Sequence, residues 1–264
     1  MKVRSNSALK TILTIALNTF REAVRDRVLY NLVIFVLLII ACAILLGDLT
    51  DGNEARTIVN IGLNAILIFG AFIAIFVGVS LVSKEIEKRT VFAIFAKPVR
   101  RSEFVLGKYL GLCLTLLVNV VVMGVGVSLA LVYVNGGSLI YSIWGSILLI
   151  FLELTILTAV AILFSSFSSP ALSALLTFFT FVIGHMSASL RDLAAGLGSK
   201  FAVFFFEVIY YLLPNLAHYS FRTEAANGMV PTSPMIGGAV IYAIVYSSIL
   251  LLVSALIFRR RNFK

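Results

Sequence analysis

The run from Ile140 to Phe164, IYSIWGSILLIFLELTILTAVAILF, decides the fold of this chain. It shows neither the strict alternation of a half-buried strand nor a broad polar face, and its one acid is Glu153. The hydrocarbon core of a bilayer is crossed by about 20 apolar residues in a helix, and this run is long enough to do so. We therefore expect a membrane span here.

Five further runs have the same character: 28–46, 61–82, 104–134, 171–190 and 236–258. In lipid each span must satisfy its own backbone hydrogen bonds, and the alternation of a β-barrel is missing from these runs. The expected fold class is an all-α integral membrane protein with six transmembrane helices in a single domain over residues 1–264. A span of 31 residues at 104–134 would tilt or project from the membrane, because it exceeds a core of about 30 Å.

Composition supports this class and excludes others. Of 264 residues, 61% are hydrophobic and 12% are charged, whereas soluble domains average about 45–50% and about 25%. The mean hydropathy is +1.08. Such a chain is too apolar for a soluble globule or a disordered protein.

The basic residues indicate the orientation. Six lie in 1–27, seven in 83–108 and four after residue 258. Short cytoplasmic segments are enriched in Lys and Arg, so both termini and the 83–108 loop are expected in the cytoplasm. This distribution explains the net charge of +9 by the anionic membrane face, and we expect no nucleic-acid partner.

Two flanking regions differ from the spans. Residues 1–27 have helical apolar spacing with a basic face, which predicts an amphipathic helix flat on the cytoplasmic surface; a helix packed on a partner is the alternative. In 191–235 the apolar run 201–213 is too short to span, carries Glu207 and is closed by Pro214. It predicts short extracytoplasmic re-entrant or interfacial helices before the last span.

Catalytic signatures do not occur in the sequence. Cys42 and Cys113 have neither disulfide nor zinc spacing, and His185 and His218 stand apart from other ligands. The phosphate-binding pattern fails around Lys108, because Tyr109 follows it. We expect no enzyme activity, no metal site and no directly bound cofactor, so any ATP-driven work needs another chain.

The segment 83–108 reads SKEIEKRTVFAIFAKPVRRSEFVLGK. Pro98 cannot continue a preceding helix, and it biases Lys97 away from helical geometry. Ser102 suits the N-cap of the next span, with Glu103 in its first turn. The pattern predicts a helix–turn–helix elbow at the cytoplasmic surface. An ordinary basic loop that only sets topology is the equal alternative.

Two motifs in this segment resemble the cytoplasmic loop of ABC-2-type transporter permeases: Glu-x-Glu-Lys-x-Thr from Glu85, and Lys-Pro-Val-x-Arg-x-Glu-Phe-x-Leu-Gly-Lys from Lys97. The basic-threonine form is similar to the branch that includes permeases for multicopper-enzyme (nitrous-oxide reductase) maturation. Arg89 and Arg100 stand where many members have Gly and Ser. The resemblance implies that residues 83–103 are the coupling loop that docks on an ATPase, through Glu85, Glu87, Lys88, Thr90, Ile94, Pro98, Arg101 and Glu103.

The same resemblance implies a type V ABC exporter-like fold and a role as permease subunit of an ATP-driven exporter in the prokaryotic cytoplasmic (inner) membrane. Its partners would be two copies of an ABC ATPase holding Mg–ATP, a second permease subunit as homodimer or homologous heterodimer, the lipid bilayer, and an extracytoplasmic accessory protein. The alternatives are an ATP-independent secondary transporter or channel, and a structural membrane protein. The substrate is not indicated.

Glu153 is the one acid inside a predicted span. A charge in lipid is costly unless it is paired, protonated or facing water. We predict that Glu153 lines a translocation path at the dimer interface. The equal alternative is a glutamate that joins helices through Thr155, Thr158 or hydroxyls of another span.

Small residues recur at four-residue spacing in three predicted spans, which permits close helix contact. We expect them to allow helices to pack within one subunit or, as the alternative, at an interface between subunits. The three sets are Gly70, Ala74 and Gly78; Gly107 and Gly111; and Ala239, Ala243 and Ser247.

Overall fold

The computed structural model describes residues 2–25, 29–47, 52–80, 101–196 and 200–260. These residues form helices and connecting turns, with no strand among them. The helices are α1 (Lys2–Ala23), α2 (Leu29–Gly47), α3 (Glu54–Phe72), α6 (Arg101–Tyr133), α7 (Ile140–Ser165), α8 (Pro170–Gly196), α9 (Lys200–Leu212), α10 (Arg222–Ala226) and α11 (Ser233–Arg260). A π-helical turn, η2 (Ile73–Val77), continues α3, and 3₁₀ turns lie at η3 (Gly137–Leu139) and η4 (Leu216–Tyr219).

Four of the described helices are long and apolar enough to cross a membrane: Glu54–Ser80, Arg101–Tyr133, Gly137–Ser165 and Ser233–Phe258. They confirm the predicted runs at 61–82, 104–134, 140–164 and 236–258. The helix α2 coincides with the predicted run at 28–46, and α8 contains a shorter apolar stretch, Pro170–Met186. The described part of the chain is therefore all-helical, and its several apolar helices are consistent with a multi-pass membrane protein.

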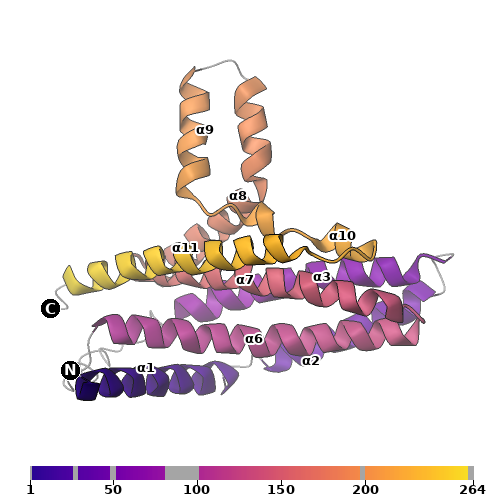
Figure 1. The fold of residues 1–264 in the computed structure, drawn as a ribbon, viewed down its shortest axis with the longest axis horizontal. Coiled ribbons are helices and arrows are strands. Elements are labelled where there is room, and N and C mark those ends of the chain that lie inside the picture. The colour runs from indigo at the N-terminus through magenta and orange to yellow at the C-terminus, as the bar shows by residue number, and fades with distance from the viewer. Residues whose placement is uncertain (1, 26–28, 48–51, 81–100, 197–199, 261–264) are drawn as a thin grey trace.

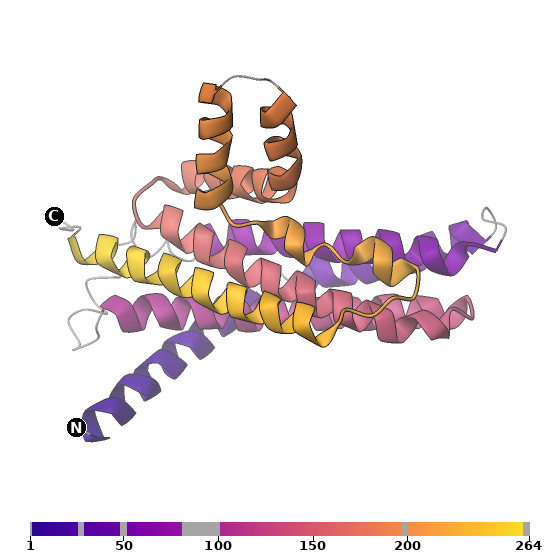
Figure 2. The ribbon, with the colours of Figure 1, turned by 45° about the horizontal axis from the view of Figure 1, so that its top comes forward.

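The long helices lie side by side in one elongated bundle (Figures 1 and 2), with α7 packed between α6 and α11 and with α3 against both α6 and α7. The helix α1 begins and α11 ends at the same end of the bundle (Figure 1). The last part of α8 and all of α9 form a hairpin that stands out from the bundle in both views.

One predicted boundary is wrong, and one helix extends beyond its predicted apolar run. Ser102 lies inside the first turn of α6, which begins at Arg101, and so is not its N-cap. The helix α8 continues past the predicted apolar run 171–190 to Gly196. Its extension, SASLRDLAAG, is rich in good helix formers and ends on glycine, and these local preferences outweigh the loss of apolar character.

The helix α1 presents three faces, which its spacing only partly predicted. Lys10, Asn18, Arg21 and Arg25 are exposed on the polar face, as expected. The other residues divide into two faces. Ala16, Ala23 and the polar Thr19 are buried, whereas Leu9, Leu13 and Leu17 form an exposed stripe. The buried face packs on α6, and the leucine stripe is left for lipid.

Glycines allow α1 to approach α6 closely. A Cβ at Gly111 would lie 2.5 Å from the carbonyl oxygen of Ala16 and 2.6 Å from Cβ of Thr19. A Cβ at Gly107 would lie 2.7 Å from the side chain of Ile15. Because a backbone carbonyl cannot turn aside, any larger residue at 111 must push the two helices apart.

The other small-residue sets also pack inside this chain. Gly70 meets Leu154 of α7, and a Cβ at Gly78 would lie 3.2 Å from Ala161 of the same helix. Ala239, Ala243 and Ser247 of α11 are buried, and both alanines belong to a cluster with α7. The interpretation as packing within the monomer is therefore confirmed for these contacts.

We predict opposite effects of two Gly→Ala substitutions. Gly111→Ala lowers the free energy of unfolding of the solubilised protein by about 1–3 kcal/mol, and with it the melting temperature, because the added methyl overpacks the α1–α6 contact. Gly237→Ala, in α11, meets nothing within 4 Å and is neutral or stabilising, because alanine favours helix. Melting curves of both variants test the contact; a Gly111→Ala protein as stable as Gly237→Ala would contradict it.

Candidate functional site

The predicted coupling segment is only partly within the described residues. Six of its eight implied docking positions lie outside them: Glu85, Glu87, Lys88, Thr90, Ile94 and Pro98. Arg101 and Glu103 open α6, where Glu103 is in the first turn, as predicted. Whatever the segment binds, the chain leaves it directly into α6.

The first residues of α6 are joined to the last turn of α11. The guanidinium of Arg101 donates a hydrogen bond from Nη1 to the carbonyl oxygen of Phe258. The rings of Phe104 and Phe258 meet edge to face with centroids 6.4 Å apart, and both are buried. Helices far apart in the sequence thus share one contact at this end of the bundle.

A buried lysine joins α1 to the same place. Lys108 is 3% exposed, its Nζ lies 3.7 Å from Oε2 of Glu22, and it lies 5.9 Å from the Phe104 ring centroid. Ammonium groups are rarely buried without a partner, so this contact adds charge pairing to the glycine-mediated packing. We name Glu22, Arg101, Phe104, Lys108 and Phe258 the α1–α6–α11 junction.

Sequence reasoning missed the Glu22–Lys108 pair, because the two residues come from helices with no local spacing relation. The failed phosphate-loop pattern drew attention to Lys108 for a different chemistry. An available signal was the position of Lys108 beside the two glycines of a predicted span, where a charge needs a partner.

Glu153 lies in the interior of the chain, 1% exposed. Its Oε1 is 3.3 Å from Nε2 of His185 in α8. The hydroxyls of Thr155 and Thr158 do not serve Glu153, since they donate to the carbonyl oxygens of Leu152 and Leu154 in their own helix. The proposed threonine partners are therefore wrong, and His185, considered only as an isolated histidine, is the group that faces the acid.

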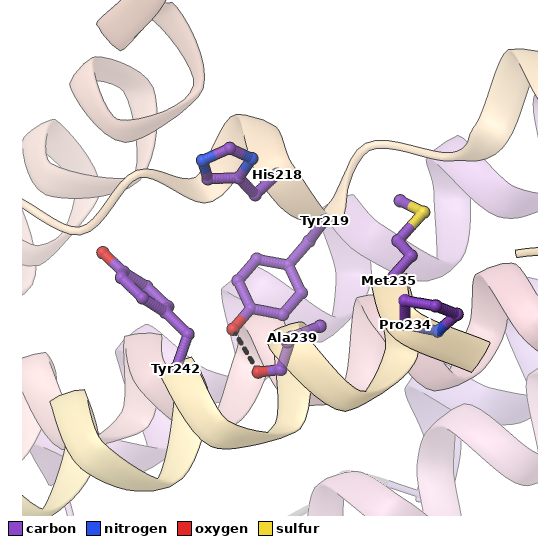
Figure 3. Close-up of a pocket in the computed structure, with 7 residues that line it drawn as sticks. His218, Tyr219, Pro234, Met235, Ala239 and Tyr242 are labelled. Atoms are coloured by element: carbon purple, nitrogen blue, oxygen red, sulfur yellow. Dashed lines mark hydrogen bonds between the residues drawn. The ribbon is translucent and has the colours of Figure 1, made fainter. Parts of the chain in front are cut away.

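A pocket of about 350 Å³ lies between η4 and the start of α11 (Figure 3). Its walls are mostly apolar and aromatic, and the lining residues are His218, Tyr219, Pro234, Met235, Gly238, Ala239 and Tyr242. Tyr219 points down onto α11, with His218 above it and Tyr242 beside it (Figure 3). The walls suit an apolar or aromatic group better than a charged one.

Tyrosines hold the segment after α9 onto α11. The hydroxyl of Tyr219 donates to the carbonyl oxygen of Ala239 at 2.9 Å, and that of Tyr246 donates to the carbonyl oxygen of Leu212 at 2.9 Å. The backbone N–H of Asn215 donates to the Tyr242 hydroxyl at 3.1 Å. Burial raises the pKa of Tyr219, so its hydroxyl remains a donor across the ordinary pH range. The region predicted as re-entrant is thus anchored by specific bonds.

No group of three or more His, Cys, Asp and Glu able to hold a metal occurs among the described residues.

Most of the described helices lie in a range that resembles a known protein family. A family model described as "ABC-2 family transporter protein" matches residues 13–197, which is more than half of the chain. A search of curated proteins gives no match. The matched range contains α2, α3, α6, α7 and α8, together with the second half of α1. Members of this family are membrane subunits of transporters, generally non-catalytic, that normally work with an ABC ATPase. This chain is a member of the ABC-2 transporter family.

Proposed function

We propose that this chain is the membrane-spanning permease subunit of an ATP-driven exporter. It crosses the prokaryotic cytoplasmic membrane six times, with both termini inside, in a type V exporter-like arrangement. Family membership supports the transport role. A start and an end of the described chain at one end of the bundle (Figure 1) are compatible with six crossings.

The observation that carries the coupling proposal is the α1–α6–α11 junction. The coupling segment feeds into α6 at Arg101, and Arg101 is bonded to Phe258 of α11. Lys108, two turns further along, is paired with Glu22 of α1. A force applied to the segment by an ATPase would therefore move three helices together. A coupled transporter that alternates between two states needs such a rigid connection from the ATPase contact to its membrane helices.

In this proposal two identical or homologous permease subunits form the pathway. Two separate ATPase subunits bind Mg–ATP, and each docks on the coupling loop of a permease subunit. Glu85, Glu87, Arg101 and Glu103 contribute to docking or to the internal pairing of the loop. Glu153 contributes to the path. This chain binds no nucleotide or cofactor itself, and an extracytoplasmic accessory protein is a further partner. A secondary transporter, channel or structural protein would purify without an ATPase, which is the simplest distinction.

Coupling is tested by substitutions in the loop. Glu87→Lys and Ile94→Pro should leave membrane insertion intact but reduce transport per ATP hydrolysed by the reconstituted complex. The first reverses a docking charge, and the second would break the helix that the sequence predicts before Pro98. Glu54→Lys, a charge reversal at the start of α3, is the control and should keep wild-type coupling. Wild-type coupling in both loop variants would remove the docking assignment.

Orientation is tested by cysteine labelling in cells, with Cys42 and Cys113 replaced by alanine. Asn135→Cys, in the exposed turn between α6 and α7, should react with a membrane-impermeant maleimide added outside. Ser169→Cys, in the exposed turn between α7 and α8, should react only after the membrane is opened. The reverse pattern would invert the proposed topology.

A further inference from the structure

A buried acid faces a partly buried histidine where α7 meets α8, and the two atoms that face each other are both buried. Oε1 of Glu153 and Nε2 of His185 are 3.3 Å apart. Within the described part of the chain, neither atom has a hydrogen-bond partner. Buried polar atoms usually find partners, so this pair of atoms calls for a physical explanation.

The tautomer of His185 supplies one. Its Nδ1 lies 3.1 Å from the carbonyl oxygen of Phe181, and a carbonyl only accepts, so Nδ1 carries a proton. In a neutral imidazole Nε2 is then a lone-pair acceptor. An ionised Glu153 would place a second acceptor opposite it, and the buried pair would carry one uncompensated negative charge. A single added proton, on either group, removes both problems and leaves the pair with no net charge.

The base of the α8–α9 hairpin closes beside this pair. A Cβ at Gly184 would lie 2.8 Å from the carbonyl oxygen of Pro214 and 2.8 Å from Leu216. These residues follow α9 directly, and Leu216 is fully buried in a cluster with residues of α7. The neighbour of Gly184 in the chain is His185, so a contact between His185 and α7 acts at the point from which the hairpin projects.

We propose that Glu153 and His185 together bind one proton, and that this proton-binding pair fastens the base of the α8–α9 hairpin to α7. The site takes a proton and nothing larger. When the proton leaves, a buried carboxylate faces a lone pair, and the contact between the helices becomes unfavourable. The proposal does not depend on coupling to an ATPase.

Several neighbours act on the pair. Burial opposes a net negative charge on it. Arg222 of α10 acts electrostatically on both groups. Tyr219 of η4 acts electrostatically with Glu153.

Other charged groups on the neighbouring elements lie away from the pair. The described charges of α3 and α6 lie within the first two turns or so of each helix: Glu54, Arg56, Arg101, Glu103 and Lys108. Glu207 of α9 is exposed. The side chains of Arg191 and Asp192, later in α8, lie outside the described set.

The first experiment is a pH series of melting curves for the solubilised full-length protein. Above the ordinary histidine pKa of about 6.5, the folded chain holds one proton more than the unfolded chain. Stability must then fall as pH rises, by up to about tenfold in the unfolding constant per pH unit. Glu153→Gln copies the protonated acid, because its amide donates to Nε2, and should remove this part of the slope. Glu224→Gln, at an exposed carboxylate, should keep it.

A protein in which Glu153→Gln retains the wild-type slope does not hold its proton at this pair, and the proposal is then wrong. Infrared difference spectra over the same pH range give an independent reading. A protonated-carboxyl or imidazolium signal that titrates in the wild type should be missing from Glu153→Gln. Its persistence in that variant would also overturn the assignment.

The second experiment tests the anchoring by hydrogen exchange at one fixed pH near neutrality. His185→Phe keeps an aromatic ring against Phe181, whose centroid lies 4.7 Å from the imidazole, but loses Nε2. Amides of α9 should exchange several-fold faster in His185→Phe than in the wild type, and Glu153→Gln should resemble the wild type. Equal exchange in all three proteins, or fast exchange in Glu153→Gln, would show that the pair does not hold the hairpin.

Discussion

Close contact between helix backbones is the constraint on which this bundle depends. Lipid is as apolar as the helix surfaces, so burying leucine against leucine gives little reason for helices to associate. What remains is dense packing, and here it occurs where glycine removes the side chain. Gly111 brings α6 onto the backbone of α1, and Gly184 brings α8 onto the segment after α9. The positions of α1 and of the hairpin both follow from these contacts.

Hydrogen bonds fix the relative positions of elements that packing alone would allow to shift. Many buried hydroxyls, such as those of Thr115 and Thr158, donate to the carbonyl four residues earlier in their own helix, so they satisfy themselves without joining helices. Other bonds in the described part of the chain do join elements, among them Arg101 to Phe258, Tyr219 to Ala239, and Ser142 to Ala225. Each connects parts of the chain that are distant in the sequence, and each fixes a register that glycine contacts leave free.

Much of the architecture could be predicted because one solvent imposes it. The length and apolarity of a run such as 140–164 are requirements of the bilayer, and they recur in α7 almost residue for residue. The N-terminal helix was predictable from its period of 3.6, since its polar face is exposed as expected. The end of α8 was not, because helix propensity beyond residue 190 competes with apolar character, and the sequence does not show which prevails.

The candidate sites divide in the same way. That Glu153 needs compensation follows from lipid alone, but its partner depends on which faces of α7 and α8 meet, and no local pattern encodes that. The Glu22–Lys108 pair was missed for the same reason. Arg101 and Glu103 were located at the start of α6 by the proline before them and by motif, and the bond to Phe258 could not have been foreseen from either.

The leucine stripe of α1 has a mechanical consequence for α6. One face of α1 is held on α6, and Leu9, Leu13 and Leu17 are exposed on the adjoining face. The amphipathic pattern predicts that these leucines lie among acyl chains. In that case a change in the tilt of α6 would either move the leucines toward water or move the basic face of α1 into the hydrocarbon region. The thickness and lateral tension of the host bilayer therefore affect the relative free energies of conformations that differ in the tilt of α6, because α1 is attached both to α6 and to the membrane surface.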